Sequence, residues 1–394
     1  MTDRYCPVPW YEVHINADGS YHSCGAQPNY VTGTPFGNKH NIKVMSIPMW
    51  MNSQHQKLAR MGKRNGDWNP LCTMCYREDE LGKSSKRKRE VEKFDKPFES
   101  LEVSDLPQSY HISIGNECNL ACRMCMPSWS SRIAAEQRRT GEYTGPVKYS
   151  WMDDPQAWKN FTDSVLNCDL RAIHIIGGEP LIIPRFEELI DLLIDNGKTN
   201  CYMGFTTNGT VFNNKLMEKL SVFRHTDIGV SVEATDVLND FIRTGSDTPT
   251  ILANLEKFIE YRSEGRFYVT LRAVPSALSV PGLFELFTWC MDRKLDVMTN
   301  TLHHPEYMTI ETLPSDVKQR LLEKYNAWKF NPNPRSGNDR DPNLYWEHID
   351  GEIASIIQQL QQPNNPDNTK KLYNIMATYP KWDQAKKYFT SREV

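Results

Sequence analysis

The sequence has 394 residues, a formal net charge of -3 and 24% charged residues. A chain of this length can bury a large core, in one barrel-sized domain with additions or in several smaller domains. The near-neutral charge excludes a general preference for nucleic acids or membranes, so any such preference must be local.

The sequence contains no segment with the composition of a membrane span or a leader. No stretch approaches the roughly 18 uninterrupted apolar residues that a spanning helix needs. The residues before Cys6 contain no apolar run of the kind that secretion signals carry. We therefore expect an unprocessed cytoplasmic protein without a membrane partner.

The ten cysteines fall into two clusters and a set of isolated positions. In a large cytosolic chain, clustered C-x-x-C spacings are more typical of metal ligands than of disulfides. The isolated cysteines lie next to apolar segments and are expected to be buried structural thiols. They are Cys168, Cys201 and Cys290.

Residues 1–82 are predicted to form a small module that a metal holds together. They are rich in Cys, Gly, Pro, Asn and aromatic residues and poor in long periodic runs, so their core alone is weak. Two strand-like runs between Val8 and Ser23 flank Asp18-Gly19, which predicts a hairpin with its turn at these two residues.

Four cysteines of this module are candidate ligands of one metal centre. Cys6 and Cys24 lie at the two ends of the predicted hairpin, which brings them together, and Cys72 and Cys75 form a C-x2-C pair. Four thiolates form a closed ligand set for an iron-sulfur cluster. The same four thiolates suit zinc, so the residues alone leave both metals open.

Residues 83–108 are charged and contain two prolines, which is typical of a connector between modules. The basic run Lys86-Arg87-Lys88-Arg89 is interpreted as solvated, with nucleic-acid contact as the less favoured alternative. Gly82-Lys83-Ser84 imitates the end of a phosphate-binding loop. We exclude phosphate binding there, because the first glycine of that motif is missing and no apolar strand precedes it.

Residues 109–304 alternate short apolar runs with amphipathic stretches. This alternation predicts a parallel α/β layout, either an open sheet or a partial barrel. Ligands of both architectures gather at the carboxyl ends of the strands. The predicted strands are 110–114, 172–176, 202–205, 227–232, 267–271 and 295–298, and the predicted helices are 129–139, 185–195, 213–220, 248–263 and 281–292.

The segment after the first of these strands carries Cys118, Cys122 and Cys125 in a C-x3-C-x2-C motif. Three thiolates on one short loop suit a [4Fe-4S] cluster and leave its fourth iron open to another ligand. Zinc is the alternative, but structural zinc normally has four ligands. His111 is a weak candidate for the fourth, because it lies inside the strand.

This spacing, and its position after a first strand, resemble the signature of the radical S-adenosylmethionine (radical SAM) superfamily. The resemblance implies a partial (β/α)6 barrel of the TIM type over residues 109–304, with a [4Fe-4S] cluster on the three cysteines and S-adenosylmethionine on the open iron. Members usually carry an aromatic residue just before the third cysteine. This chain has Met124 there, and the resemblance assigns its backbone to the adenine.

Motifs after the later strands are similar to the cofactor-binding elements of the same superfamily. The resemblance implies that Gly177-Gly178-Glu179-Pro180 receives the cofactor's amino group, Ser231 and Glu233 its ribose, and Arg243 its carboxylate. Structural explanations stay open, since glycine and Asn-Gly pairs suit turns and an arginine suits the surface. The predicted cofactor-binding residues are Met124, Gly177, Gly178, Glu179, Pro180, Thr207, Asn208, Ser231, Glu233, Arg243 and Val274.

The hairpin and C-x2-C pair of residues 1–82 resemble the twitch domain, a shortened relative of the SPASM domain. The resemblance implies an auxiliary [4Fe-4S] cluster on Cys6, Cys24, Cys72 and Cys75. In the family this module ordinarily follows the barrel, whereas here it precedes it. The family resemblance therefore does not give the distance between the two clusters in this chain.

Residues 305–394 are predicted to form a helical C-terminal extension, with a breaker at 331–334. Ile349, Ile353, Ile356, Ile357 and Leu360 recur at helical spacing and indicate one amphipathic helix. We expect this extension to pack on the barrel as a lid or a docking element.

The resemblance implies an enzyme that cleaves S-adenosylmethionine reductively and abstracts hydrogen from a peptide or protein side chain. An electron donor such as flavodoxin or ferredoxin is expected. Oxidation or rearrangement of a sugar or nucleotide is the alternative within this class. A zinc-stabilised nucleic-acid-binding protein is the alternative outside it. The sequence identifies no catalytic side chain beyond the cluster ligands.

Overall fold

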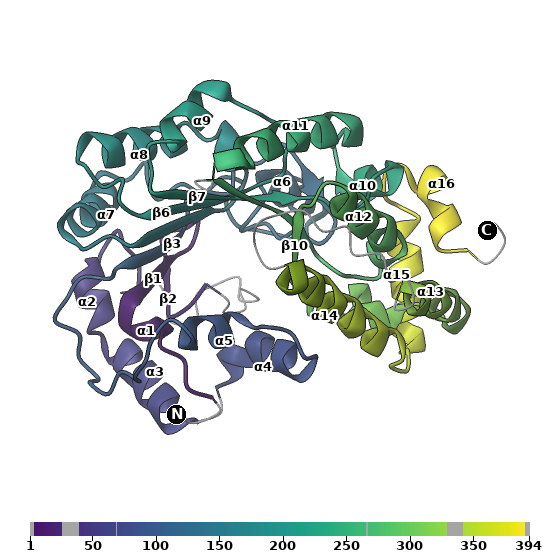
Figure 1. The fold of residues 1–394 in the computed structure, drawn as a ribbon, viewed down its shortest axis with the longest axis horizontal. Coiled ribbons are helices and arrows are strands. Elements are labelled where there is room, and N and C mark those ends of the chain that lie inside the picture. The colour runs from purple at the N-terminus through teal and green to yellow at the C-terminus, as the bar shows by residue number, and fades with distance from the viewer. Residues whose placement is uncertain (1–3, 26–38, 68, 265–266, 329–341, 391–394) are drawn as a thin grey trace.

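The computed structural model describes residues 4–25, 39–67, 69–264, 267–328 and 342–390 (Figure 1). A mixed sheet forms the centre of the molecule, and among the described residues its strand order is β10-β9-β7-β6-β5-β3-β1-β2. The strands are β1 (Glu12–Ile15), β2 (Tyr21–His22), β3 (Ser109–Ser113), β4 (Ala121–Cys122), β5 (Ala172–Ile176), β6 (Tyr202–Thr207), β7 (His225–Ser231), β8 (Arg243–Thr244), β9 (Phe267–Ala273) and β10 (Asp296–Thr299).

All six predicted strands of residues 109–304 are confirmed as β3, β5, β6, β7, β9 and β10. Each pairs in parallel with the next one along the chain. Consecutive parallel strands with helical crossovers form the predicted partial barrel, and the carboxyl ends of all six strands lie at one edge of the sheet.

Helices cover one face of this sheet. Figure 1 shows α7, α8, α9 and α11 along the same side of the strands. The helices are α1 (Val8–Tyr11), α2 (Ile47–Met51), α3 (Gln54–Asn65), α4 (Thr73–Glu80), α5 (Lys86–Val91), α6 (Ser131–Thr140), α7 (Pro155–Asn167), α8 (Pro184–Asp195), α9 (Asn214–Leu220), α10 (Val237–Ile242), α11 (Thr248–Glu260), α12 (Val280–Asp292), α13 (Ser315–Trp328), α14 (Pro342–Leu360), α15 (Pro366–Met376) and α16 (Trp382–Ala385).

The five predicted helices of this region are confirmed as α6, α8, α9, α11 and α12, and α7 and the short α10 are additions to them. Asp154 caps the first turn of α7, and Pro155 occupies the position where proline is favoured. Ala157, Phe161 and Val165 are buried at helical spacing, and the ring of Phe161 packs edge-on against Tyr110 of β3. The sequence of α7 therefore contains a capping residue, a favoured proline and apolar residues at helical spacing, although this helix was not among those predicted.

The predicted hairpin of the N-terminal module is confirmed, with β1 and β2 antiparallel and Gly19 at φ +86° in the turn. Its first run begins as the helical turn α1 rather than as a strand. In addition, β1 pairs in parallel with β3, with Val13 opposite Tyr110. The N-terminal module is thus joined to the barrel through one continuous sheet.

The interpretation of the basic run Lys86-Arg87-Lys88-Arg89 as solvated does not hold for Lys86, and the segment that begins at residue 83 makes contacts inside the molecule. Lys83 is buried and its ammonium lies 2.9 Å from a carboxylate oxygen of Glu352, which is also buried. Lys86 begins α5 and lies 2.7 Å from the buried Glu12 of β1. A buried charge requires a partner of opposite sign, so these lysines join the first module to the barrel and to the C-terminal extension.

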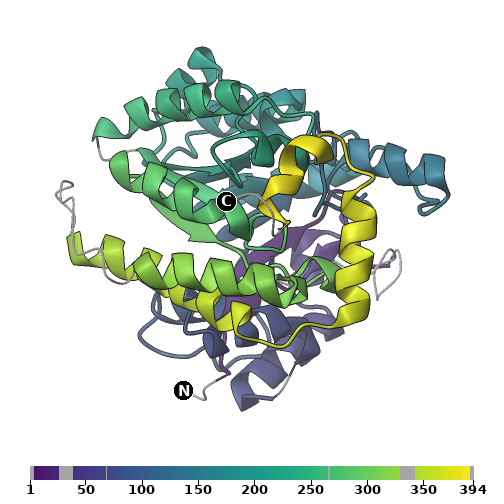
Figure 2. The same cartoon turned by 90° about the vertical axis from the view of Figure 1, so that its right-hand side faces the viewer.

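The C-terminal extension packs on the barrel, as expected. The predicted apolar residues of α14 are buried, from Ile349 to Leu360. Lys381 lies 2.8 Å from Asp240 of α10, and Trp382 packs against Phe241 of the same helix. Figure 2 shows the green-to-yellow C-terminal helices crossing this side of the molecule. The predicted breaker at 331–334 lies outside the described residues.

The three isolated cysteines are buried, as predicted. The Sγ of Cys168 donates to the carbonyl of Val165 at 3.4 Å, and that of Cys201 donates to the carbonyl of Lys198 at 3.2 Å. Burial raises the pKa of Cys201 to about 12, so this thiol is a poor nucleophile. Among the described helices, none is both long enough and apolar enough to cross a membrane.

A row of histidines lies across neighbouring strands of the sheet. His14 is opposite His22 of β2 and His111 of β3, and His111 is opposite His174 of β5. The ring centroids of His14 and His111 are 4.9 Å apart, and those of His111 and His174 are 5.2 Å apart. Burial lowers the pKa of His14 to about 3 and that of His174 to about 3, so both imidazoles are neutral in the folded protein.

We therefore predict that the free energy of unfolding falls as the pH is lowered from about 7 toward 4. The unfolded chain takes up protons on these histidines below its ordinary pKa of about 6.5, whereas the folded chain does not, so protonation favours unfolding. Each histidine contributes a loss of about 1 kcal/mol near pH 5.5. Denaturant titrations at pH 7 and pH 5.5 should show that the free energy of unfolding falls less in the His14→Gln, His174→Gln double variant than in the unsubstituted protein. An equal loss in both proteins would contradict this account.

Candidate functional site

The three cysteines of the central motif lie on the segment between β3 and α6, at the carboxyl edge of the sheet. Cys122 belongs to β4, which pairs antiparallel with β8 and places Cys122 opposite Arg243. Burial is the main cause that raises the pKa of the Cys125 thiol, and the nearby thiols of Cys122 and Cys118 raise this pKa further. The structure therefore brings the three predicted ligands together.

Polar contacts fix the conformation of this segment. The Leu120 N–H donates to the Sγ of Cys118 at 3.4 Å. The Ser130 hydroxyl caps α6 and also donates to the Leu120 carbonyl at 2.8 Å. The side-chain amide of Asn116, which is fully buried, donates to the Pro127 carbonyl at 2.8 Å. These bonds hold the cysteine segment between a strand and a helix.

Gly177 and Gly178 follow β5 and pack directly against the cysteine segment. They adopt φ values of +90° and +52°, which favour glycine. A Cβ on Gly177 would lie 1.8 Å from the Ser113 hydroxyl, and one on Gly178 would lie 2.1 Å from the Glu117 carbonyl oxygen. Both glycines are therefore required by the packing of the chain itself, in addition to any role toward a ligand.

Glu179 joins this turn to the end of the next strand. Its carboxylate is fully buried and accepts hydrogen bonds from the Thr207 hydroxyl at 2.7 Å, the Asn208 N–H at 2.5 Å and the Leu181 N–H at 3.0 Å. Burial raises its pKa, while these three bonds act in the opposite direction. Pro180, also buried, follows at the start of a short 3-10 helix.

Asn208 links the same turn to the cysteine segment. Its side-chain amide donates to the Oδ1 of Asn119 at 2.8 Å and points to the Sγ of Cys118 at 3.9 Å. Its Oδ1 accepts from the Thr210 hydroxyl at 2.7 Å. Thr207 and Asn208 are thus near the first cysteine, at the rim where the sequence placed them.

Arg243 is buried beside the three cysteines, so its interpretation as a solvated surface residue is wrong. Its exposed fraction is 8%, and its Nη1 lies 3.1 Å from Glu233, which is fully buried. The Val274 N–H donates to the other oxygen of Glu233 at 2.9 Å. The Nε of Arg243 is buried without a hydrogen-bond partner among the described residues. Ser231 is half-buried at the end of β7, opposite Arg272 of β9.

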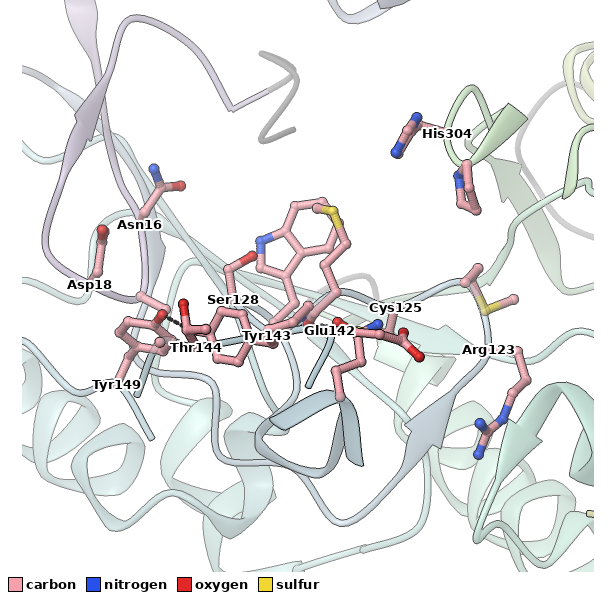
Figure 3. A pocket seen from close by; sticks show the side chains of 18 of the residues that line it. Asn16, Asp18, Arg123, Cys125, Ser128, Glu142, Tyr143, Thr144, Tyr149 and His304 are labelled. Atoms are coloured by element: carbon pink, nitrogen blue, oxygen red, sulfur yellow. Dashed lines mark hydrogen bonds between the residues drawn. The ribbon is translucent and has the colours of Figure 1, made fainter. Parts of the chain in front are cut away.

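A cavity of about 870 Å3 opens beside the third cysteine. Met124 and Cys125 line one part of it, and three other segments complete its wall (Figure 3). These segments are the hairpin turn of the N-terminal module, the loop that follows α6, and the C-terminal extension. They contribute Asn16, Asp18 and His22; Glu142, Tyr143 and Tyr149; and His304, Tyr307, Asn368 and Lys371.

Figure 3 shows the side chains of the hairpin and of the loop at 304 on opposite sides of this space, with Cys125 between them. In Figure 1 the N-terminal helices α3, α4 and α5 and the C-terminal helices α13 and α14 all lie on the side of the sheet opposite to α8, α9 and α11. The cavity therefore depends on segments from both ends of the chain.

A second cavity, of about 300 Å3, is lined by Cys6, Cys24, Cys72 and Cys75. The structure thus brings the four predicted N-terminal ligands together. Burial raises the pKa of the Cys6 thiol to about 12, and Lys63 on the cavity wall acts in the opposite direction.

The hairpin of the N-terminal module contributes to both cavities. His22 of β2 lines the larger cavity, and Cys24, two residues later in the chain, lines the smaller one. The polypeptide therefore runs directly from the wall of the larger cavity to one of the four N-terminal cysteines.

The residues of both sites fit iron-sulfur clusters. None of the ten cysteines, all of which lie in the described part of the chain, is paired in a disulfide. The first site offers three thiols, with a buried arginine whose Nε has no partner in the described structure. Such an arginine suits a bound carboxylate. The second site offers four thiols around one cavity, with lysines on its wall.

Comparison with protein-family models matches two parts of the chain. Residues 112–274 match the model of the radical SAM superfamily, and residues 6–76 match the model of an iron-sulfur cluster-binding domain, SPASM. The barrel of this chain is therefore a radical SAM domain, and enzymes with this domain use a [4Fe-4S] cluster and S-adenosylmethionine as cofactors. The iron-sulfur cluster-binding domain precedes this barrel in the chain.

Solved structures that resemble the chain include radical SAM proteins with bound cofactor. Native anSMEcpe with bound AdoMet is 18% identical with a TM-score of 0.42, over 57% of this chain and 60% of that one. SuiB from Streptococcus suis bound to S-adenosylmethionine is 15% identical with a TM-score of 0.34, over 71% of this chain and 62% of that one. The matches thus span less than two thirds of these proteins. A comparison with curated protein sequences found no match.

Sequence reasoning missed the wall of the larger cavity. Tyr149, Tyr307 and Lys371 lie in segments without a motif, and only the fold brings them next to Cys125. It also missed Lys63, whose position inside a short polar helix gives no sign of its contact with Cys72.

Proposed function

We propose that this chain modifies a peptide or protein side chain by radical chemistry in the cavity of about 870 Å3. The observation that carries the proposal is that Cys125 and Met124 line this cavity together with the hairpin that leads to Cys24. A substrate there would contact the first cluster site on one side and the hairpin that leads to the auxiliary site on the other.

In this proposal Cys118, Cys122 and Cys125 hold a [4Fe-4S] cluster, and Cys6, Cys24, Cys72 and Cys75 hold an auxiliary one. When bound, the first cluster and S-adenosylmethionine supply the reductive cleavage that yields methionine and a 5′-deoxyadenosyl radical able to abstract hydrogen. The electron comes from an external donor such as flavodoxin or ferredoxin.

We assign the cofactor contacts to the residues around the first site. The unpartnered Nε of Arg243 supports an interaction with the cofactor's carboxylate. The Glu179 carboxylate already accepts three hydrogen bonds, so we assign the amino group mainly to the backbone of Gly177 and Gly178, with Glu179 as a nearby negative charge. Pro180 fixes the end of this turn.

The remaining predicted residues would surround the nucleoside. Ser231 and Glu233 lie at the carboxyl end of β7, where the ribose is expected, and the Glu233 carboxylate also holds Arg243 in place. Met124 and Val274 would contact the adenine through their backbones and side chains. Thr207 and Asn208 would lie between the nucleoside and the cysteine segment.

A peptide substrate is supported by the size and make-up of the larger cavity. Its volume, about 870 Å3, lies near the upper end of the range of about 300 to 1,000 Å3 for small-molecule sites, so it has room for a peptide side chain together with neighbouring backbone. Tyrosines on its wall, among them Tyr143, Tyr149 and Tyr307, offer flat apolar surfaces with polar tips, which suit the mixed surface of a peptide. SPASM and twitch modules are also frequent in peptide-maturing members of the superfamily.

The chain connection between the two cavities supports a role for the auxiliary cluster as an acceptor. A neutral substrate radical in the larger cavity becomes a neutral closed-shell oxidised product when it loses one electron and one proton. His22 of β2 lines this cavity and Cys24, two residues further along the chain, lines the auxiliary cavity, so the hairpin offers the electron a covalent route toward the auxiliary cluster.

The proposal is tested by coupling cofactor cleavage to peptide modification. The reconstituted chain is incubated anaerobically with S-adenosylmethionine, a reductant and a peptide library, and 5′-deoxyadenosine and peptide mass are measured together. We expect at least one peptide to change mass in proportion to the 5′-deoxyadenosine formed. Cleavage that never couples to any peptide, but couples to a sugar or nucleotide, would overturn the assigned substrate class.

A further inference from the structure

Two lysines line the auxiliary cavity, and their surroundings differ. Lys86 is half-buried, and its Nζ lies 2.7 and 2.9 Å from the two carboxylate oxygens of Glu12. Its charge is therefore already balanced by a carboxylate. Any effect of Lys86 on the cavity is reduced by this neighbour.

Lys63, near the end of α3, has no such carboxylate. It is buried, with an exposed fraction of 5%, and its Nζ donates a hydrogen bond to the Sγ of Cys72. It also lies 5.8 Å from the ring centroid of Tyr76. Within the described part of the chain, no aspartate or glutamate forms an ion pair with Lys63, whereas Lys57 of the same helix pairs with Glu102 at 2.7 Å.

A buried ammonium without a counter-charge is costly, so the fold implies a negative group next to Lys63. The thiols of Cys72 and Cys6 are the candidates. The ammonium of Lys63 is hydrogen-bonded to the Sγ of Cys72, and Lys63, Cys72 and Cys6 all line the auxiliary cavity. Lys63 therefore complements a thiolate ligand set rather than a set of neutral thiols.

We propose that Lys63 raises the reduction potential of the auxiliary cluster and thereby makes this cluster a better acceptor of the substrate electron. Reduction adds one negative charge to the cluster. A nearby ammonium stabilises the reduced state more than the oxidised state, and a hydrogen bond to a ligand sulfur acts in the same direction. Lys63 is thus a positioning residue that acts through Cys72. This inference rests on the proposed iron-sulfur cluster in the auxiliary cavity.

The test measures the midpoint potential of the auxiliary cluster alone. The full chain carrying Cys118→Ala, Cys122→Ala and Cys125→Ala is reconstituted anaerobically, and the reduced cluster is followed by electron paramagnetic resonance during a redox titration. Three further substitutions are compared in this background. Lys63→Met removes the charge and the donor, Lys63→Gln keeps a donor without charge, and Lys57→Met removes an exposed charge from the same helix.

We expect Lys63→Met to lower the midpoint potential by about 60 mV, a tenfold change in the one-electron equilibrium. Lys63→Gln should lower it less, and Lys57→Met should leave it unchanged. Equal potentials in the Lys63→Met, Lys63→Gln and parent proteins, or an equal shift from Lys57→Met, would overturn the proposal. If Lys63→Met binds no iron, the Lys63→Gln protein decides between these outcomes.

A parent protein that binds zinc in place of iron in this cavity would overturn the inference as well. The proposed function is checked separately, because the unsubstituted chain would still cleave S-adenosylmethionine at its first site in that case. Loss of that cleavage would instead contradict the proposed function.

Discussion

Replacing Cys118, Cys122 and Cys125 with alanine is expected to reduce S-adenosylmethionine cleavage to the rate seen without protein, while iron remains in the N-terminal module. The three cysteines are the thiols near Arg243, and the cofactor supplies the chemistry that no side chain of the protein provides. The four N-terminal cysteines line a separate cavity, so their ligand set is untouched.

The measurement combines iron content, visible absorption and 5′-deoxyadenosine formation after anaerobic reconstitution. A matched control replaces Cys168, Cys201 and Cys290 with alanine, which removes the same number of buried thiols away from both cavities. The control should keep both iron sites and its cleavage activity. Loss of all iron from the first variant would contradict two independent sites.

The second large effect is expected from Gly178→Ala. The new Cβ would lie 2.1 Å from the Glu117 carbonyl oxygen and 2.8 Å from other backbone atoms of Glu117, which cannot rotate away as a side chain can. Displacement of the turn or of the cysteine segment would break the contacts that Glu179 makes with Thr207 and Asn208. We expect a loss of stability of roughly 2 to 4 kcal/mol, from the positive φ of about 1 kcal/mol and overpacking of 1 to 3 kcal/mol.

Gly197→Ala is the control for this substitution. Gly197 has φ +66°, close to the +52° of Gly178, but nothing lies within 4 Å of its Cβ position. It should cost only the conformational part, about 1 kcal/mol, and leave cofactor cleavage intact. Denaturant titration and cofactor-binding measurements on both variants separate the two contributions. Equal losses of stability in the two variants would contradict a contribution of the close contact between Gly178 and Glu117 to the free energy of unfolding.

Local patterns in the sequence were sufficient for the barrel and its cysteine segment. The strands from Tyr110 to Met298 are apolar runs separated by amphipathic helices, and each element carries its own signal. The Cys, Gly-Gly-Glu and Asn-Gly motifs follow strands that end at one edge, so their proximity follows from the parallel topology. Burial of Arg243 did not follow, because it depends on the two-residue pairing of β8 with β4.

Contacts between distant segments explain what the sequence did not reveal. The pairing of β1 with β3 joins residues that are far apart in the chain, and all four residues of β1 are buried, so no alternation marks its faces. The basic run at Lys86 has the composition of a solvated segment, and the contact of Lys86 with the buried Glu12 is not visible in that composition. Residues such as Lys371 form a cavity wall through packing of the C-terminal extension, which leaves no local motif.

The central claim is that S-adenosylmethionine binds to an iron-sulfur cluster held by the three cysteines of the barrel. The most direct test uses a chain with Cys6, Cys24, Cys72 and Cys75 replaced by alanine, so that the barrel cluster alone gives a resonance signal after reduction. We predict that adding S-adenosylmethionine changes the electron paramagnetic resonance spectrum of this cluster, because the cofactor becomes a ligand of its open iron. A barrel that takes up iron and shows the same spectrum with and without the cofactor would contradict the claim.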